Sequence, residues 1–412
     1  MTPVTTTEAD ASAAAEWRAH WRVVAGAGLG VATGYGLFPF VASQFVQPLE
    51  ATFGWPRAAQ ALTQTAAIGG AFLAPAVGRA VDAVGVRPIA LVGMPLLAIV
   101  YGLLATMHGS IAVFYGLMGA AILTGLGTTG IVYIRAVTTC FYVSLGRALA
   151  VTRSGVALTA AVVPILIFDA IHRFGWRAGY ALLAAITLAG LLPCWLWVRE
   201  PSKVPRGAAT ERRSWSRLLL NSRIVLLCLS VALTMGPVVG LLSQLQPLLT
   251  GKGIEPATAA MFGGLLALSV LAGTLLTGLL MDRIWAPLIG CVFSIVPAIG
   301  CLLLLSPSVS HGTAAAAVIG IGLAQGAELD LAGYMIARYF GIADFAAIFG
   351  LSILGIGISS ALSSVAYARI FDQFGSYNHA LQASTVLFGA ASAAYLCMGK
   401  YPRPFQDLAR EH

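Results

Sequence analysis

Long apolar stretches alternate with short polar ones along almost the whole chain. Twelve of these stretches have close to the ~20 residues with which an α-helix crosses about 30 Å of hydrocarbon. Lipid does not tolerate irregular backbone, and the stretches lack the alternating polarity of membrane-barrel strands. The pattern therefore predicts an all-α membrane protein with twelve transmembrane helices, at residues 22–46, 58–78, 88–107, 112–140, 147–170, 178–198, 223–249, 257–281, 287–306, 314–340, 345–370 and 379–398.

The two halves of the chain repeat each other. The landmarks that recur, all at an offset of 199 or 200 residues, are Gln47-Pro48-Leu49 as Gln246-Pro247-Leu248, Gly54 and Pro56 as Gly253 and Pro256, Asp82 as Asp282, and Phe174-Gly175 as Phe374-Gly375. Chance apolar composition would not keep these landmarks in register. The repeat predicts two pseudo-symmetric six-helix bundles related by an axis along the membrane normal, with a site at their interface.

Polar segments predict the domain boundaries. Residues 199–222 hold prolines, a glycine and many basic side chains, which is typical of a cytoplasmic linker. Residues 1–20 are rich in Ala and Thr and have no cationic region before a cleavable apolar stretch, so we expect a disordered cytoplasmic tail and no signal peptide. The N-terminal bundle is expected at 21–198, the C-terminal bundle at 223–399 and a second cytoplasmic tail at 400–412.

Composition and charge agree with a membrane protein. Of the 412 residues, 58% are apolar and only 10% are charged, too much apolar surface for a water-soluble globule to bury. The net charge of +8 is unevenly placed, because only five of the 24 Lys and Arg residues fall on the outside: Arg57, Arg173, Arg177, Lys252 and Arg369. This asymmetry predicts a cell (inner) membrane protein with cytoplasmic N- and C-termini, and no nucleic-acid partner.

Two arginines lie inside predicted helices, where each needs a partner or a task because insertion costs at least ~2.5–3.5 kcal/mol. Arg135 lies roughly 9 Å from the cytoplasmic end of the fourth stretch, and Arg153 lies about seven residues into the fifth. A short turn between antiparallel neighbours places both at nearly the same depth. They are candidates to bind a substrate carboxylate through forked hydrogen bonds. The alternatives are that Arg135 snorkels or that Arg153 pairs with loop carbonyls.

The tenth stretch holds two acids, Glu328 and Asp330. Asp330, Tyr334 and Arg338 follow one helical face at four-residue steps, whereas Glu328 points roughly 160° away from Asp330. One acid is expected to face a central cavity, with Tyr334 as a substrate-binding candidate, and the other to satisfy a neighbouring helix. Two interpretations remain: proton coupling through Asp330 or Glu328 against an anionic substrate, or a structural acid–arginine pair.

Four uncharged residues are weaker candidates for a cavity lining. Tyr35 and Phe38 in the first stretch, Tyr133 in the fourth and Gln244 in the seventh would supply rings and hydrogen bonds to a substrate, and ordinary helix packing is the alternative for each. The six cysteines have neither paired nor metal-like spacing, so we expect reduced core residues and no metal. The chain has no phosphate-binding loop and no His-Glu-x-x-His, which predicts no enzyme activity, no cofactor and transport driven by gradients.

A short polar turn between the second and third stretches has an echo between the eighth and ninth. The first turn holds Gly78, Asp82, Gly85 and Arg87, and the second repeats the Gly-x-x-x-Asp spacing up to Asp282 and Arg283. Glycine permits an unusual φ, and a carboxylate beside arginines gives the turn an ionic bond. This spacing resembles the cytoplasmic loops of the major facilitator superfamily. The resemblance implies a conformational, gating role for these residues and for Arg338 at the cytoplasmic end of the tenth stretch.

Further motifs resemble one branch of that superfamily. Pro48-Leu49 followed by Phe53-Gly54-Trp55-Pro56-Arg57-Ala58, with Arg338-Tyr339-Phe340-Gly341 later, is similar to the bacterial monocarboxylate porters and oxalate/formate antiporters. The resemblance implies a monomeric secondary transporter of small organic anions that uses a proton or a counter-anion. The eighth stretch carries no charge before Asp282, unlike those porters, and we infer that Arg135 and Arg153 substitute. An exporter of amphipathic or cationic compounds is the alternative, and a transporter-like sensor is a third hypothesis.

Overall fold

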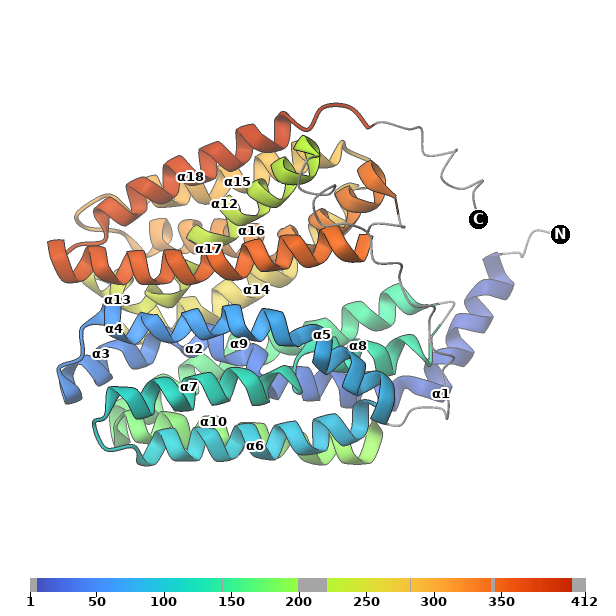
Figure 1. The fold of residues 1–412 in the computed structure, drawn as a ribbon, viewed down its shortest axis with the longest axis horizontal. Coiled ribbons are helices and arrows are strands. Elements are labelled where there is room, and N and C mark those ends of the chain that lie inside the picture. The colour runs from blue at the N-terminus through green and yellow to red at the C-terminus, as the bar shows by residue number, and fades with distance from the viewer. Residues whose placement is uncertain (1–5, 142–143, 199–220, 282, 342–344, 402–412) are drawn as a thin grey trace. The chain divides into compact units, whose positions relative to one another are not determined.

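The structure, a computed structural model, describes residues 6–141, 144–198, 221–281, 283–341 and 345–401. Within these ranges it is helical with short connections and has no strand (Figure 1). Each of the twelve predicted stretches is helical, which confirms the all-α prediction. Most of the predicted linker, 199–220, lies outside the described residues, as do 402–412 of the predicted C-terminal tail.

The first half of the chain forms helices that begin and end as follows: α1 (Thr6–Thr33), η1 (Tyr35–Leu37), α2 (Phe38–Val41), α3 (Ser43–Phe53), α4 (Arg57–Ala61), η2 (Leu62–Thr65), α5 (Ala66–Val84), α6 (Val86–Thr106), α7 (Ile111–Leu126), α8 (Gly130–Thr138), α9 (Leu145–Phe174) and α10 (Trp176–Trp197). The second half forms α12 (Ser222–Ser243), α13 (Leu245–Gly251), α14 (Pro256–Met281), α15 (Ala286–Leu303), α16 (His311–Phe340), α17 (Phe345–Phe374) and α18 (Asn378–Leu396).

Several predicted transmembrane stretches are built from more than one helix. Among the described residues, eight helices are individually long and apolar enough to cross a membrane, and a ninth span is the pair Ala14–Thr33 and Tyr35–Val41, bent by 54°. The fourth stretch breaks between α7 and α8, and the seventh breaks at Gln244 between α12 and α13. At the bend after Gly34, the Tyr35 N–H donates to Thr128 Oγ1 at 3.0 Å, and Thr128 itself lies in the break between α7 and α8. Bent spans are tolerated because neighbouring groups satisfy the freed backbone.

The N-terminal helix extends into the stretch that the sequence predicts to be disordered. α1 begins at Thr6, and the Glu16 carboxylate accepts hydrogen bonds from the Ser144 N–H at 3.0 Å and the Ser144 hydroxyl at 2.9 Å. Ser144 precedes α9, so Glu16 supplies negative charge at the N-terminus of that helix, where the helix dipole favours it. This long-range cap is the physical reason for the difference, because composition alone does not reveal it.

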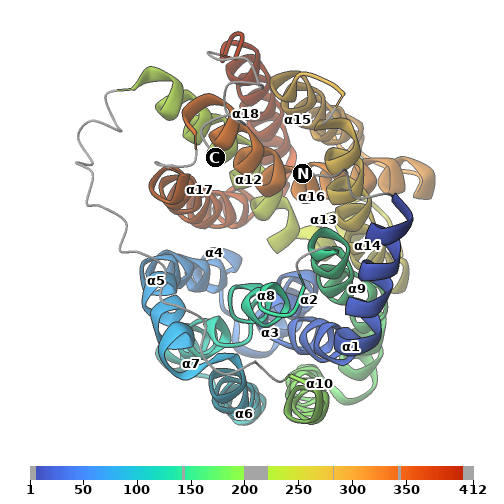
Figure 2. The same cartoon turned by 90° about the vertical axis from the view of Figure 1, so that its right-hand side faces the viewer.

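The chain divides into two compact units. Unit 1 comprises Met1–Val41 and Phe72–Ala209, and unit 2 comprises Ala42–Ala71 and Thr210–His412. Within each unit the helices lie side by side, and Figure 2 shows them almost end-on. The segment Ala42–Ala71, from the predicted outer ends of the first two stretches, groups with the later helices because α3 contacts α13 and α4 contacts α17. The division into two six-helix bundles stays a prediction.

Each unit has its own apolar core. In unit 1, α1, α5, α6, α8, α9 and α10 bury side chains such as Val24, Met94 and Val132. In unit 2, α12, α15, α16, α17 and α18 bury Leu227, Leu331 and Met335 in the same way. Small residues allow the helices to approach closely, since a Cβ on Gly326 of α16 would lie 1.9 Å from the Val270 carbonyl of α14. The two cores hold the helices that carry the charged residues described next.

Candidate functional site

The two arginines singled out in the sequence lie on neighbouring helices of unit 1. α8 is a short helix after the break at 127–129, and its residues Val132, Tyr133 and Ala136 are fully buried. Arg135 lies on the other face of α8 and is half-buried, and Arg153 on α9 is exposed. α8 and α9 contact each other, so both guanidiniums belong to adjacent segments, as predicted. Their role in substrate binding stays a prediction.

The aromatic candidates of unit 1 divide into two environments. The Tyr35 ring stacks on Phe38 with centroids 5.8 Å apart, and Phe38 stacks on Tyr101 at 6.1 Å. Gly125 makes room for this row, because a Cβ there would lie 2.6 Å from the Tyr35 ring. Tyr133, by contrast, is fully buried, with its hydroxyl 3.8 Å from Met94 Sδ and 3.7 Å from Cys194 Sγ. This placement favours the packing interpretation for Tyr133.

The acids of α16 have different surroundings within unit 2. Glu328 is 1% exposed, and its carboxyl accepts a hydrogen bond from the Tyr395 hydroxyl of α18. Asp330, Tyr334 and Arg338 are all half-buried, on the face that the four-residue spacing predicts. Glu328 therefore satisfies a neighbouring helix, whereas Asp330 reaches a less enclosed surface. Their roles in proton coupling stay predictions.

The predicted gating turns are partly described. Gly85 has φ +92° between α5 and α6, a left-handed conformation that favours glycine, and the Arg87 guanidinium donates to the Trp195 carbonyl at the end of α10, 2.8 Å away. Gly78 and Asp82 lie within α5, and the Asp82 side chain is outside the described residues, as is all of Asp282. Arg283 is exposed, and the Arg338 guanidinium lies 4.6 Å from the Tyr401 ring centroid. The gating roles stay predictions.

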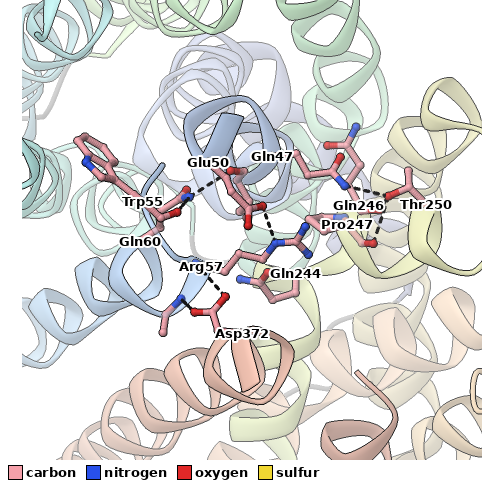
Figure 3. Close-up of polar contacts among 12 residues, drawn as sticks. Gln47, Glu50, Trp55, Arg57, Gln60, Gln244, Gln246, Pro247, Thr250 and Asp372 are labelled. Carbon is pink, nitrogen blue, oxygen red and sulfur yellow. Dashed lines mark hydrogen bonds and ion pairs between the residues drawn. The ribbon is translucent and has the colours of Figure 1, made fainter. Parts of the chain in front are cut away.

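A partly buried polar network forms at the predicted outer end of unit 2, and we call it the outer latch: Glu50, Arg57, Asp372, Tyr377 and Gln244. Figure 3 shows Glu50, Arg57, Asp372 and Gln244 of this network. Arg57 is buried at the start of α4, where its Nε donates to Glu50 of α3 at 2.8 Å and its Nη1 donates to the Tyr377 hydroxyl at 2.7 Å. The Tyr377 hydroxyl donates in turn to Gln244 at 2.9 Å. The chain of bonds links the predicted outer ends of the first, second, seventh and twelfth stretches.

Asp372 adds a second kind of contact to the outer latch. Its carboxylate, at the end of α17, accepts the backbone N–H groups of Arg57 at 3.2 Å and Ala58 at 2.8 Å. These are the first N–H groups of α4, which have no partner inside the helix, so a carboxylate is favoured there. The Arg57 guanidinium also lies 3.7 Å from the Phe371 ring centroid. Arg57 is thus held through both its backbone and its side chain.

Further bonds surround the outer latch. Gln47 Nε2 donates to the Thr250 hydroxyl at 3.3 Å, which joins α3 to α13. Lys252 is buried after α13, and its Nζ donates to the Asn378 side chain at 2.7 Å and to the Ser306 carbonyl at 3.1 Å. Removal of Lys252 from water lowers its pKa from the ordinary value, and burial raises the pKa of Tyr377 to about 12 while the Arg57 charge opposes that shift.

The sequence did not predict the outer latch. Arg57 and Lys252 were counted as outside basic residues, and Gln244 was a substrate-binding candidate, whereas its side chain here accepts the Tyr377 bond. One signal did point to this region, because the repeated landmarks Gln47 and Gln246 lie within it. Among the described residues, no three His, Cys, Asp or Glu side chains are grouped so that they would hold a metal ion.

An all-helical chain with many apolar spans and charged residues within them has the architecture of a multi-pass membrane transporter. The sequence profile of the Major Facilitator Superfamily matches residues 23–364. The chain therefore belongs to the Major Facilitator Superfamily. Its members are secondary transporters that work by alternating access and not enzymes, which settles the class of this protein.

Individual relatives are more distant. The chain is 29% identical over 140 residues to the uncharacterised MFS-type transporter YtbD of Bacillus subtilis (strain 168), a match that spans 33% of this chain and 35% of YtbD. The fold is similar to a bacterial homologue of the human lysosomal transporter Spinster in an inward-facing and occupied conformation, with TM-score 0.69, 16% identity, and coverage of 92% of this chain and 95% of that one. The nucleoside transporter NupG gives TM-score 0.75, 12% identity, and coverage of 92% and 99%.

Proposed function

We propose that this protein carries a small organic anion, a mono- or dicarboxylate, across the cell (inner) membrane by proton-coupled symport or anion exchange. The observation that carries the proposal is Arg135, a half-buried guanidinium within the fourth transmembrane stretch. A cation there costs at least ~2.5–3.5 kcal/mol on insertion scales, so it needs a partner or a task. Binding an anionic solute is one such task, because the solute adds negative charge beside the guanidinium.

The surroundings of Arg135 support this role. The opposite face of α8 is fully buried in the core of unit 1, which fixes the helix and directs Arg135 away from that core. Arg153 on the adjacent α9 brings a second guanidinium to the same unit. The planar guanidinium bonds a carboxylate through two parallel hydrogen bonds, which an ammonium does not.

Asp330 is our candidate for proton exchange. It is half-buried, whereas Glu328 is almost fully enclosed and bonded to Tyr395. A group that takes up and releases protons needs access to water during the cycle, and Asp330 is the less enclosed of the two acids. Glu328 on this view stabilises the contact between α16 and α18. We assign both chain termini to the cytoplasm on the positive-inside distribution of Lys and Arg, and a monomer as the transporting unit.

Uptake into proteoliposomes tests the proposal. The full chain is reconstituted, and uptake of radiolabelled formate, oxalate, lactate and pyruvate is followed with and without an inward proton gradient. We expect Arg135→Gln to lower the uptake rate about tenfold or more, the loss of one hydrogen bond to a charged group being worth about 1.5–3 kcal/mol. Asp330→Asn is expected to remove the response to the proton gradient.

Arg147→Gln is the matched control. Arg147 is exposed at the start of α9, and its substitution removes the same charge as Arg135→Gln does. Its uptake is expected to equal that of the wild type. Carboxylate flux that Arg135→Gln and Asp330→Asn both leave unchanged would overturn the proposal. The proposal would also be overturned if none of the four acids were taken up while a solute of another class was transported.

An exporter of amphipathic or cationic compounds is the second candidate. It is favoured by the acids of α16, since the carboxylate of a half-buried Asp330 also attracts a cationic solute. Solved relatives of similar fold include a nucleoside transporter, so the architecture itself accepts solutes other than acids. Drug-sensitivity profiles of a deletion strain separate the two candidates, because loss of an exporter sensitises the cell to cationic drugs and loss of a carboxylate carrier does not.

A further inference from the structure

Unit 2 contains a cavity of about 290 Å³ between α12, α17 and α18. α17 and α18 are consecutive helices that make few contacts with each other. α17 packs mainly on α12, whereas α18 packs mainly on α15 and also contacts α12 (Figure 2). The resulting crevice has Gly236 and Pro237 of α12 in its lining, Leu362 and Ala366 on the α17 side, and Ala383 and Leu387 on the α18 side. The separation of α17 from α18 therefore creates the cavity.

The lining favours an apolar occupant. Most of it is aliphatic, and its principal polar groups bond each other or the backbone: the Tyr367 hydroxyl and the Ser384 hydroxyl are 2.5 Å apart, and the Ser359 hydroxyl donates to the Ile356 carbonyl at 3.2 Å. A polar solute would have to leave water for a mostly aliphatic wall in which the hydroxyls of Tyr367, Ser384 and Ser359 are already engaged. A hydrocarbon chain loses no hydrogen bond on entry.

The cavity opens where hydrocarbon is the solvent. Leu362 at its edge is 67% exposed, and on a membrane-spanning helix an exposed apolar side chain fits contact with lipid. Tyr367 lies about 10 Å from the end of α17 at Phe374, and Ser384 lies about 9 Å from the start of α18 at Asn378. Both distances place the cavity below the predicted outer surface, within the outer half of the membrane.

We propose that this cavity binds one acyl chain of an outer-leaflet lipid, entering between α17 and α18. The three helices around it carry residues of the outer latch at their outer ends: Gln244 follows α12, Asp372 lies in the last turn of α17, and Tyr377 precedes α18. A chain held between these helices fixes their spacing and so stabilises the outer latch. The proposal does not depend on which solute is transported.

Photolabelling in liposomes tests the site. The full chain is reconstituted with phosphatidylcholine that carries a diazirine on one acyl chain, irradiated, and analysed by peptide mass spectrometry. We expect labels on the cavity residues of α17 and α18 to exceed those on the nearby lipid-facing surface about threefold, a modest ratio because lipid tails are as apolar as the cavity and only packing favours the bound chain. Equal labelling of the two surfaces would overturn the proposal.

Two filling variants and one control sharpen the test. Ala383→Phe and Ala366→Phe each place a ring in the cavity from an exposed alanine, so neither disturbs a core, and each is expected to abolish the excess labelling. Val386→Phe adds a similar ring on α18 at a position that is 71% exposed and does not line the cavity. Val386→Phe is expected to retain the excess labelling of the cavity residues. Excess labelling that persists in both filling variants, or that Val386→Phe removes equally, would refute a specific site.

Discussion

The Arg57→Gln substitution removes the cation from the centre of the outer latch. The guanidinium makes an ion pair of 2.8 Å with Glu50, a hydrogen bond of 2.7 Å to Tyr377 and a stacking contact of 3.7 Å with the Phe371 ring. The Asp372 carboxylate bonds the backbone of α4, so those bonds remain in the variant. The substitution therefore isolates the contribution of the side chain.

The expected magnitude follows from these three contacts. The Glu50 side chain is 36% exposed, and solvent screening keeps the ion pair near about 0.5–1 kcal/mol. The hydrogen bond from a charged donor to the buried Tyr377 hydroxyl contributes about 1.5–3 kcal/mol, and the cation–π contact about 0.5–2 kcal/mol. These terms overlap, so we expect the packing of α4 against α17 to lose about 2–4 kcal/mol. This loss is a factor of roughly 30 to 1,000 in the equilibrium constant between the formed and the broken outer latch.

Electron–electron double resonance measures this shift. Spin labels on cysteines at Thr52 and Gln373, both exposed at the predicted outer end of unit 2, report the distance between α3 and α17. Cys397, the exposed native thiol among the described residues, is replaced by serine. The wild type is expected to give mainly the short distance of the closed outer latch, and Arg57→Gln to add a longer-distance population.

Arg173→Gln is the matched control. Arg173 also forms an ion pair, 2.7 Å from Asp169, but the two side chains are 67% and 54% exposed, so the pair contributes little. Its distance distribution is expected to match the wild type. If Arg57→Gln and Arg173→Gln give the same distribution, the reasoning that assigns the stability of the outer latch to the Arg57 side chain is wrong.

Two further predictions concern stability and pH. Tyr395→Phe deprives the buried Glu328 carboxyl of its hydrogen-bond donor, which costs about 1–3 kcal/mol of folding stability. The thermal unfolding midpoint in detergent should therefore fall by several degrees. An unchanged midpoint would contradict the role of this bond. Burial raises the pKa of Tyr377 from 10.0 to about 12, so its contribution to stability is complete below about pH 10 and is lost as the pH rises towards about 12. The Thr52–Gln373 distance should therefore stay constant around neutral pH and lengthen only in strong alkali, and a transition near neutrality would count against this account.

The apolar pattern was sufficient to predict the fold. Membrane helices must satisfy their backbone internally and match the bilayer thickness, so length and hydropathy constrain them strongly. The same pattern did not reveal the break at 127–129 or the bend at Gly34, because each is a run of only a few glycine and threonine residues inside a much longer apolar stretch. It also gave no sign that Glu16 would cap α9, since that bond joins residues 128 positions apart.

The candidate site was less accessible to sequence reasoning. The four-residue spacing in α16 correctly placed Asp330, Tyr334 and Arg338 on one half-buried face, because helical geometry fixes that relation. Arg57 and Asp372 are 315 residues apart, and nothing local to either indicates that they meet. Tyr133 was a cavity candidate by residue type alone, and only packing against Met94 and Cys194 shows how enclosed it is.

The borders of the compact units fall inside the first two transmembrane stretches, after Val41 and after Ala71, and not at a loop. The short helices between those borders, α3, α4 and η2, therefore belong to a different unit from the rest of their own spans. The chain passes from one unit to the other after Val41, after Ala71 and after Ala209, which is three times in all. Cleavage within residues 199–220 alone would consequently leave the two units covalently joined.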